Sequence, residues 1–320
     1  MPSASRTAAL AALALTATLS GCGLGAGTSP RGVQLTVTSW FGAHTIGAFA
    51  HPRVSGEETV MSLLMRNARV GTSYGGAFVQ SIDGHASSTG GAEPIGWFYF
   101  VNGVQAAAGA ASTDVRSGDR IWWDLHDWSQ SEESPAVVGS FPAPFATGLE
   151  GRRLPVRVEC ARASLRACRT VTARLAALGV HAGTGAIDTG AEPHTLRVLV
   201  GAWTAIRGSA GVNVIERGPR ASGVYARFSA SGAALTLLDA QGQTVGVLGG
   251  GAGILAATRH GADAPVWVVS GTDPAGVQRA ARAFDAQELR NRFALAVSAA
   301  GTALSVPATR SALHGRPPPS

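Results

Sequence analysis

The sequence contains no lysine, so all 26 of its basic residues are arginines. We interpret this as compositional bias and not as a sign of phosphate recognition. The glycine-rich stretch GGGAG at 249–253 lacks the G-x-G-x-x-G spacing, and no Lys-Ser/Thr pair follows it as in a phosphate-binding loop. The stretch therefore indicates a turn, and the sequence predicts no nucleic-acid partner.

Catalytic and metal-binding motifs are missing as well. There is no G-x-S-x-G nucleophile elbow, and the eight histidines form no H-E-x-x-H pattern. Asp273 stands directly before Pro274, which predicts the N-cap of a helix and not a catalytic base. The three cysteines have no zinc-ligand spacing. The sequence therefore predicts no enzyme, no cofactor and no metal ion.

Length and composition indicate a folded chain of about two domains. The 320 residues are 45% hydrophobic and 14% charged, and 42 glycines favour many turns and a large β component. Residues 33–150 hold five arginines and eleven acidic residues, whereas residues 151–320 hold nineteen arginines and nine acidic residues. This opposition can dock the two halves or turn the basic half toward anionic lipid, or it reflects two unlike surfaces.

The first 22 residues have the order of a lipoprotein signal peptide. Residues 8–19, AALAALALTATL, form an apolar run that is too short to span a bilayer comfortably. Leu19-Ser20-Gly21-Cys22 resembles the lipobox of bacterial lipoproteins, in which the cysteine becomes the acylated first residue. We assign residues 1–22 to the signal peptide with its lipobox and residues 23–32 to a flexible tether. The expected location is extracytoplasmic, anchored to the cell membrane by lipidated Cys22; the alternative is ordinary secretion with a chance cysteine.

The two remaining cysteines are Cys160 and Cys168. An exported chain with an even number of remaining cysteines favours a disulfide between them. Cys160 is expected at the end of a strand and Cys168 within the next helix, so the two side chains can meet. Two buried thiols on a helix face are the alternative.

Residues 33–128 predict one helix on a small mixed sheet. VQLTVTSW at 33–40 alternates apolar and polar residues like a half-buried strand, and a second strand is expected near 45–50. Ser55 and Glu58 fit a capping box at the start of the helix. Three strands follow, in FVQSIDG, GWFYFVNGV and GDRIWWDLHDW. This order is that of a β-grasp-like domain, which gives an α+β fold class.

The second half has a different organisation. Residues 129–153 contain several prolines, serines and glycines without a period, which predicts a linker. Residues 154–305 alternate strands and helices and predict an α/β domain of unrecognised fold. Residues 306–320 are expected to form a disordered tail.

RIWWDLHDW at 120–128 holds three of the seven tryptophans. On a strand, one side carries Ile121, Trp123 and Leu125, which we expect to cover the helix built on Val60, Leu63 and Leu64. The other side carries Trp122, Asp124, His126 and Trp128. This mixed aromatic and polar face, with Trp122 and His126 at least partly accessible, suits a flat, partly polar ligand or a partner protein. Packing beneath residues 129–150, whose Phe141 and Phe145 need cover, is the alternative.

Asp124, His126 and Asp127 crowd together in the same stretch. Asp124 and His126 share one side of a strand and Asp127 lies on the other, so the three do not converge as metal ligands. A hydrogen bond between Asp124 and His126 at the sheet surface is the expected arrangement.

Four segments occur in a recognisable order: ETVMSLLMRNA, SYGGAFVQSIDG, GWFYFVNGV and SGDRIWWDLHDW. In this order and spacing, over about residues 33–128, they resemble the bacterial family of transcobalamin C-terminal-like domains. The family is named after animal cobalamin carriers, whose small β-domain closes over cobalamin held against a helical barrel. The resemblance implies a β-grasp fold and export. It brings no catalytic residue, and the helical barrel is replaced here by the α/β domain.

These observations lead us to expect a non-enzymatic, membrane-anchored ligand-binding lipoprotein. The resemblance implies cobalamin or a related corrinoid as ligand, delivered to a membrane uptake system. The candidate ligand-binding residues are Trp97, Tyr99, Asn102, Gly103, Trp122, Asp124, His126 and Trp128. The rival hypothesis is an interaction module whose β-grasp sheet docks on another envelope protein and binds no small molecule.

The lipobox generates the first testable prediction. Replacing Cys22→Ser removes the thiol that carries the diacylglycerol, so the protein should leave the membrane fraction or accumulate as an unprocessed precursor. Cell fractionation and the mass of the product measure both outcomes. If the variant fractionates and migrates like the parent protein, the lipobox assignment is wrong.

Overall fold

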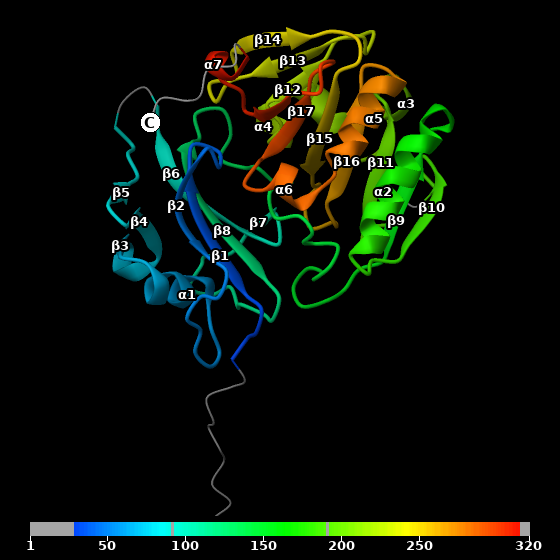
Figure 1. Ribbon diagram of the computed structural model, residues 1–320. Helices are drawn as coiled ribbons and strands as arrows, with labels where there is room; N and C mark the ends of the chain where they lie inside the picture. Colours follow the sequence, from blue (N-terminus) through cyan, green and yellow to red (C-terminus); the bar gives the residue numbers. More distant parts are fainter. Residues whose placement is uncertain (1–28, 91–92, 190–191, 314–320) are drawn as a thin grey trace, which may run out of the picture.

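Two sheets, one before residue 128 and one after residue 155, dominate the computed structural model of the chain (Figure 1). The structure describes residues 29–90, 93–189 and 192–313; Cys22 and the predicted signal peptide lie outside them. Strands make up 34% and helices 20%, which confirms the α+β class. In the described part of the chain, no helix combines the length and apolar character needed to cross a membrane.

The N-terminal sheet has the strand order β2-β1-β8-β6-β7. β1 (Gln34–Ser39) pairs antiparallel with β2 (His44–Phe49) and parallel with β8 (Arg120–Asp127). β6 (Ile95–Val101) and β7 (Val104–Gln105) complete the sheet. With one helix, α1, packed on it, this mixed sheet has the β-grasp-like arrangement expected from the sequence.

The helix α1 (Val60–Asn67) begins later than the sequence predicts. Thr59 is the N-cap, and its side chain and that of Ser62 form a reciprocal capping box. Glu58 instead accepts a hydrogen bond from the Ser55 backbone N–H, at 2.8 Å, in the loop before the helix. The expected Ser55–Glu58 contact therefore exists, but it orders the approach to the helix and not its first turn.

A small second sheet packs beside α1. It consists of β3 (Val70–Ser73), β4 (Phe78–Ile82) and β5 (His85–Ala86), and the 3-10 turn η1 (Tyr74–Gly76) joins β3 to β4. Val79 and Ile82 point into the core that also holds the buried side of α1. One side of the β3–β4 hairpin is thereby fixed to the domain, and the other side faces outward.

The C-terminal sheet has seven strands in the order β10-β9-β11-β16-β15-β17-β18. The first four are parallel to one another, and the last three pair antiparallel with their neighbours. The strands are β9 (Val156–Cys160), β10 (Ala182–Ala186), β11 (Leu196–Ala202), β15 (Gly253–Thr258), β16 (Val266–Gly271), β17 (Ala294–Val297) and β18 (Ala303–Val306).

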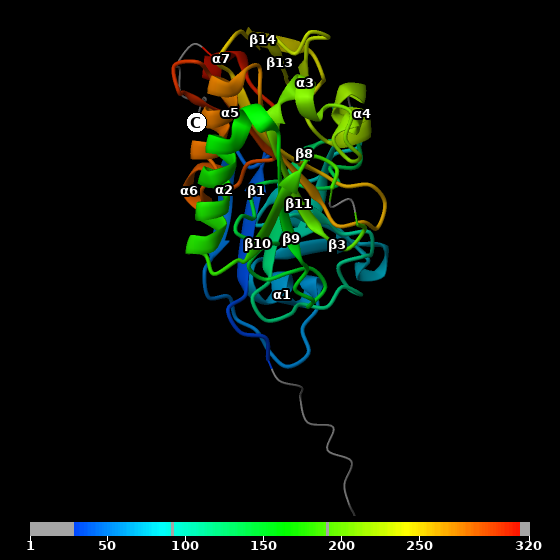
Figure 2. The same cartoon turned by 90° about the vertical axis from the view of Figure 1, so that its right-hand side faces the viewer.

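Successive residues of these strands face two different cores. Val198, Leu255 and Val269 belong to the core under α2 (Leu165–Ala177) and α5 (Pro274–Arg282), which lie side by side on one face of the sheet (Figure 2). Leu199 and Val268 belong to the opposite core. The period-two alternation of a strand thus produces a sheet that is buried on both faces.

The opposite core is covered by a three-stranded sheet and short helices. The sheet consists of β12 (Ala226–Phe228), β13 (Leu235–Leu238) and β14 (Thr244–Leu248). The short helices on this side are α3 (Trp203–Ile206), η3 (Asn213–Arg217), α4 (Pro219–Ser222) and α7 (Arg310–Leu313). Two further short helices, η2 (Arg162–Ser164) and α6 (Ala286–Leu289), lie on the side of α2 and α5. Side chains of the N-terminal sheet enter the same core, so the two halves are in direct contact.

The connecting segment 129–153 is packed into the molecule, although none of the helices or strands falls within it. Val137 is part of the core shared by the two halves. Phe141 and Phe145 contact Trp267 and Phe284 in the core under α2 and α5. The two phenylalanines are therefore covered by the α/β half and not by the tryptophans of β8.

The chain stays ordered beyond the expected start of the tail at residue 306. Val306 and Ala308 are 1% and 3% exposed, and the Ala308 backbone N–H donates to the Leu238 carbonyl at 2.8 Å. The helix α7 follows, whereas residues 314–320 lie outside the described residues. The prediction of a disordered tail from residue 306 relied on the prolines and small residues of this segment. It is wrong at its start, because two apolar side chains are enough to hold the segment against β13.

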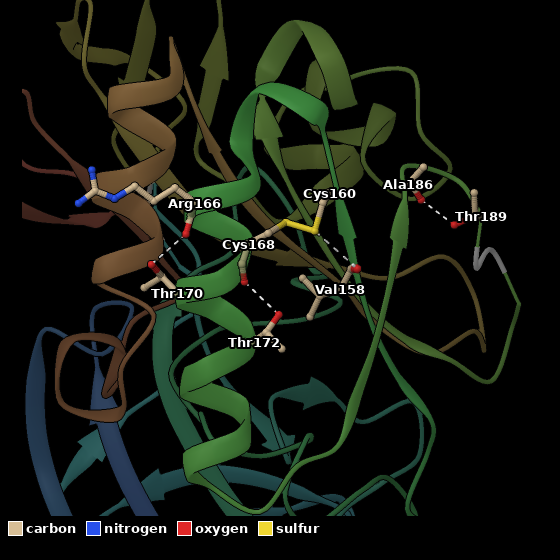
Figure 3. Close-up of a disulfide and its surroundings, with 8 residues drawn as sticks. All are labelled: Val158, Cys160, Arg166, Cys168, Thr170, Thr172, Ala186 and Thr189. Atoms are coloured by element: carbon tan, nitrogen blue, oxygen red, sulfur yellow. Dashed lines mark hydrogen bonds between the residues drawn. A yellow bond between two sulfur atoms is a disulfide. The ribbon is translucent and has the colours of Figure 1, made fainter.

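The expected disulfide joins the end of β9 to α2. The sulfur atoms of Cys160 and Cys168 are 2.03 Å apart, and Figure 3 shows the bond between the strand and the helix. Cys168 is buried together with Val171 and Leu175 in the core under α2. The bridge therefore fastens the first strand of the α/β half to the helix that covers it.

The disulfide generates a prediction about stability. Closing a loop of this length should contribute about 2–3 kcal/mol to the free energy of unfolding in the chain-entropy model. Native protein should show no free thiol at Cys160 or Cys168 by mass spectrometry without reduction, and a Cys160→Ser/Cys168→Ser variant should unfold at lower urea concentration. Two free thiols in the native protein would contradict the assignment.

Candidate functional site

The predicted site residues are divided between the two faces of the N-terminal sheet. Trp123 and Ile121 pack in one core with Val60, Leu63 and Leu64 of α1, which confirms the prediction for these two residues of β8; Leu125 is buried outside that core. Tyr99 stacks on Trp123 with ring centroids 4.9 Å apart, and its hydroxyl donates to the Ala108 carbonyl at 2.6 Å. Burial raises the pKa of Tyr99.

Trp97 lies on the same side and donates its indole N–H to the His85 carbonyl at 3.2 Å. Trp97 and Tyr99 therefore do not meet Trp122 in one site. Trp128, at the end of β8, is half-buried and contacts Gly96, where an added Cβ would lie 3.2 Å from its ring.

Asn102 and Gly103 have a structural role in the β6–β7 turn. Both have left-handed backbones, with φ of 53° and 81°, as an Asn-Gly hairpin requires. The Asn102 amide donates to Asp119 at 2.8 Å and to the Gly148 carbonyl at 3.0 Å, and it accepts from the Arg120 N–H at 2.9 Å. With Asn102 fully buried and these partners in place, the side chain is not free to bind a ligand.

Asp124 forms the polar centre of the other face of the sheet. Its carboxylate is fully buried and accepts from the Thr38 hydroxyl at 2.5 Å and from the backbone N–H groups of Phe41 and Gly42 at 3.0 and 2.8 Å. It is also 2.9 Å from Nδ1 of His126, as the sequence predicts for this pair. Four partners satisfy a group that would otherwise be costly to bury.

The turn between β1 and β2 supplies two of these donors. Trp40, Phe41 and Gly42 are all left-handed, with φ of 55°, 57° and 81°. Successive left-handed residues turn their N–H groups toward one point, and here that point is the Asp124 carboxylate. Thr38 continues the network, because its hydroxyl oxygen accepts the Trp122 indole N–H at 2.6 Å.

Aromatic rings enclose the imidazole of His126. Phe98 stacks on it at 4.6 Å between ring centroids, Phe41 lies at 4.5 Å, and the edge of Phe293 lies at 5.2 Å. Phe293 comes from the α/β half, directly before β17, and also contacts Trp122 at 5.3 Å. One side chain of the second half thus fills the space over the sheet.

The expectation that this face is accessible is wrong. Trp122 is 3% exposed, Asp124 0% and His126 2%. The sequence pattern identifies a face that is aromatic and polar, but it does not say what covers the face. The cover comes from the α/β half of the same chain together with the connecting segment, whose Val137 shares the core with Trp122 and whose Gly139 lies against the Trp122 ring.

The contact surface between residues 33–128 and the α/β half is called the seam. Backbone segments of the two halves also approach closely there. A Cβ on Gly42 would lie 1.8 Å from the Asn291 carbonyl oxygen, and one on Gly139 would lie 2.7 Å from the Arg292 nitrogen. The Val138 N–H donates to the Phe293 carbonyl at 3.2 Å. Residues 291–293 are thus held between the β1–β2 turn and the connecting segment, and only glycine fits at the two closest points.

Asp127 extends the seam at the end of β8. It is fully buried and accepts from the Gln241 side chain of the α/β half at 2.7 Å. The buried Tyr225 ring contacts Phe41 at 5.2 Å, and burial together with the negative charge of Asp127 raises the pKa of its hydroxyl. In the described part of the chain, no ion pair joins residues 33–128 to residues 154–313, so opposite net charge does not act here through paired side chains.

The seam offers little chemistry. An Asp–His pair orients the imidazole in hydrolase triads, but the neighbours recorded for His126 among the described residues are Asp124 and three phenylalanine rings. No group of three acidic, histidine or cysteine side chains suited to a metal occurs in the described ranges. The arrangement holds the buried side chains in place and excludes water from them. We assign it no catalytic role.

A polar pocket of about 560 Å³ lies in the α/β half, at the N-terminal ends of β11 and β16. Its polar lining includes Glu192, Arg197, Asn213, Arg217, His260 and Asp263. A second pocket, of about 490 Å³ beside the disulfide, has mostly apolar or uncharged lining and one charged residue, Arg169. None of the residues of the polar pocket was among the sequence candidates.

Arg197, which lines the polar pocket, belongs to an ion-pair network with a buried partner, Glu159. The Arg197 guanidinium binds both Glu159 carboxylate oxygens, at 2.6 and 2.9 Å, and Asp188 at 3.0 Å. The hydrogen bonds to Glu159 raise the pKa of Arg197. A signal for this pair was present in the sequence, since VRVEC and TLRVLVG each place a charged residue inside an apolar strand, where charges must be paired.

The fold and the seam define an α+β protein whose small β-grasp-like domain is docked on an α/β half. Residues 57–127 match the model of a family described as Domain of unknown function (DUF4430), which is known as transcobalamin-like. The match covers β8 and β6 but neither the β1–β2 turn nor the α/β half. Neither a curated protein nor a solved structure matches the chain.

The seam generates a prediction about stability. Phe293→Ala and Trp122→Ala should each lower the free energy of unfolding by about 3–5 kcal/mol, because each leaves a cavity in the shared core. Urea denaturation of the full chain measures the effect. Phe78→Ala is the matched control, since Phe78 is 64% exposed, and it should change stability by about 0.5 kcal/mol or less. If Phe293→Ala behaves like the control, the seam is not packed as described.

Proposed function

We propose that this protein is a non-enzymatic binding protein, held on the outer side of the cell membrane by acylated Cys22, whose ligand binds to the α/β half. The observation that carries the proposal is the closed seam. Because Phe293 and Phe41 fill the space over Trp122 and His126, the transcobalamin-like sheet serves as a docking surface within the chain. Ligand recognition then belongs to the open polar pocket.

The polar pocket supports this proposal by its size and by its side chains. Small-molecule sites usually enclose about 300–1,000 Å³, and this pocket has about 560 Å³. Arg217 and Asn213 form no ion pair or side-chain hydrogen bond with the other described residues, so both can bind a ligand. Glu192 and Asp263 place acidic groups in the same lining. A polar molecule with groups of both charges fits this set.

Cobalamin or a related corrinoid is the second candidate ligand, and the match to a transcobalamin-like family favours it. For a corrinoid to reach Trp122 and His126, the α/β half would have to move away and expose Phe293 and Phe41. Binding at the sheet would therefore require the free energy needed to separate the two halves at the seam. The rival function, docking of the same face on another envelope protein, meets the same cost.

A thermal-shift experiment on the full chain tests the proposal. The probes are cyanocobalamin and a set of amino acids, short peptides and sugars. A ligand of the pocket at about 100 times its dissociation constant should stabilise the protein by about 2.7 kcal/mol. Arg217→Ala should abolish that stabilisation, whereas Arg227→Ala, an exposed arginine on β12, should leave it unchanged.

Cyanocobalamin distinguishes the two candidates. Under the proposal it does not bind at the sheet, and any binding it shows is sensitive to Arg217→Ala. Saturable cobalamin binding that Phe293→Ala strengthens and Arg217→Ala leaves unchanged would place the ligand between the two halves and overturn the proposal.

A further inference from the structure

The β3–β4 hairpin exposes two aromatic side chains at its tip. Tyr74 is 85% and Phe78 64% exposed, and their rings meet edge to face with centroids 5.7 Å apart. These are the two highest exposed fractions among the large hydrophobic side chains of the described residues. Exposed aromatic pairs of this kind mark a surface that contacts another phase or molecule.

The backbone of the tip is shaped to present this pair. Tyr74, Gly75 and Gly76 are consecutively left-handed, with φ of 49°, 67° and 94°. A Cβ on either glycine would meet nothing within 4 Å, so no neighbouring segment forces this conformation. A non-glycine residue in the left-handed region is unfavourable. The turn therefore projects Tyr74 outward without any packing gain inside the protein.

The hairpin is connected through α1 to the loop that contacts the first described residue. Ser29, the first described residue, accepts a hydrogen bond from the Gly56 N–H at 2.9 Å, in the loop that leads into α1. The hairpin shares its core with α1 through Val79 and Ile82. Figure 1 shows the loop, α1 and the hairpin grouped on the side of the N-terminal sheet away from the α/β half.

The length of chain before Ser29 fixes how far this region can be from the membrane. Seven residue steps separate Cys22 from Ser29, and a fully extended chain spans at most about 3.3–3.6 Å per residue, or roughly 25 Å in total. An eight-residue helix such as α1 is about 12 Å long. An acylated Cys22 therefore keeps α1 and the hairpin within reach of the bilayer surface.

The charges on α1, on the loop before it and at the base of the hairpin are compatible with an anionic lipid surface. Glu58 pairs with Arg66 at 3.2 Å and Asp83 with Arg69 at 3.5 Å. Arg31 and Arg53 form no ion pair with the described residues, and the exposed acid of the same loop is Glu57. Arg31, two residues after Ser29, and Arg53, in the loop that Ser29 contacts, thus carry positive charge outside any ion pair among the described residues near the tether, where cationic side chains favour anionic headgroups.

We propose that Tyr74 and Phe78 insert into the headgroup region of the membrane that carries the lipid anchor, and that Met65 of α1, 55% exposed, lies at the same surface. The partner is the lipid bilayer. Tyrosine and other aromatic side chains are favoured at this depth, because the ring is apolar and the hydroxyl stays hydrated. The contact orients the polar pocket relative to the membrane, and the inference rests on the lipid anchor of the proposed function.

Fluorescent labelling of the acylated full chain tests this inference. A Phe78→Cys variant carries an environment-sensitive nitrobenzoxadiazole label, and Val247→Cys on β14, where Val247 is 61% exposed, is the matched control. The protein is reconstituted in phosphatidylethanolamine–phosphatidylglycerol vesicles. The label at position 78 should be at least about threefold less accessible to an aqueous quencher than the label at 247.

Vesicle binding of the unacylated chain supplies the second measurement. In the Cys22→Ser background, Tyr74→Ala/Phe78→Ala should weaken sedimentation with the same vesicles by about tenfold, since both exposed rings lose their apolar contact. Val247→Ala should leave it unchanged. Both substitutions are at exposed positions, so folding is checked by an unaltered urea midpoint.

The outcomes separate this inference from the proposed function. If the chain is not acylated at Cys22, the anchor itself is wrong. If it is acylated but the label at position 78 is as accessible as that at 247, the anchor stands and the membrane contact is wrong. A label shielded in intact cells but accessible in vesicles would mean that a protein partner covers the tip, which also overturns the inference.

Discussion

The buried carboxylate of Asp124 is the constraint on which the arrangement of the two halves depends. A buried carboxyl group needs hydrogen-bond partners in place of water, and the chain supplies the Thr38 hydroxyl, two backbone N–H groups and the His126 imidazole. To supply the backbone donors, the β1–β2 turn adopts three left-handed residues in a row. That conformation directs the Phe41 ring over His126 and toward Tyr225 and Phe293 of the second half.

At the seam, what the sequence presents as two domains and a linker shares one core. Trp122 and Phe100 of the N-terminal sheet share a core with Leu199 and Val268 of the C-terminal sheet. The face that the sequence suggested for a flat ligand is covered here by the other half. The surfaces that we propose for function remain open: the polar pocket at one end of the α/β sheet and the aromatic tip of the β3–β4 hairpin.

Local sequence patterns predicted the helices, strands and turns well, because these elements depend on interactions between residues close together in the chain. Alternation in RIWWDLHDW placed Trp123 on α1, and the Asn102-Gly103 pair marked a real hairpin turn. The accessibility of Trp122 could not be predicted, since it is decided by Phe293, which lies 171 positions later in a segment with no distinctive pattern. The polar pocket could not be predicted for the same reason. Its lining comes from three separate chain segments, and the order of the strands in the sheet brings them together.

Calorimetry of the full chain tests the shared core most directly. If the two halves form one cooperative unit, heating should give a single transition whose calorimetric and van't Hoff enthalpies agree. Two separable transitions in the intact protein, one for residues before the connecting segment and one for those after it, would show that the halves fold and open independently. In that case the face formed by Trp122, Asp124 and His126 would again be available to a ligand, and the seam would not be the closed, shared core on which the proposed function depends.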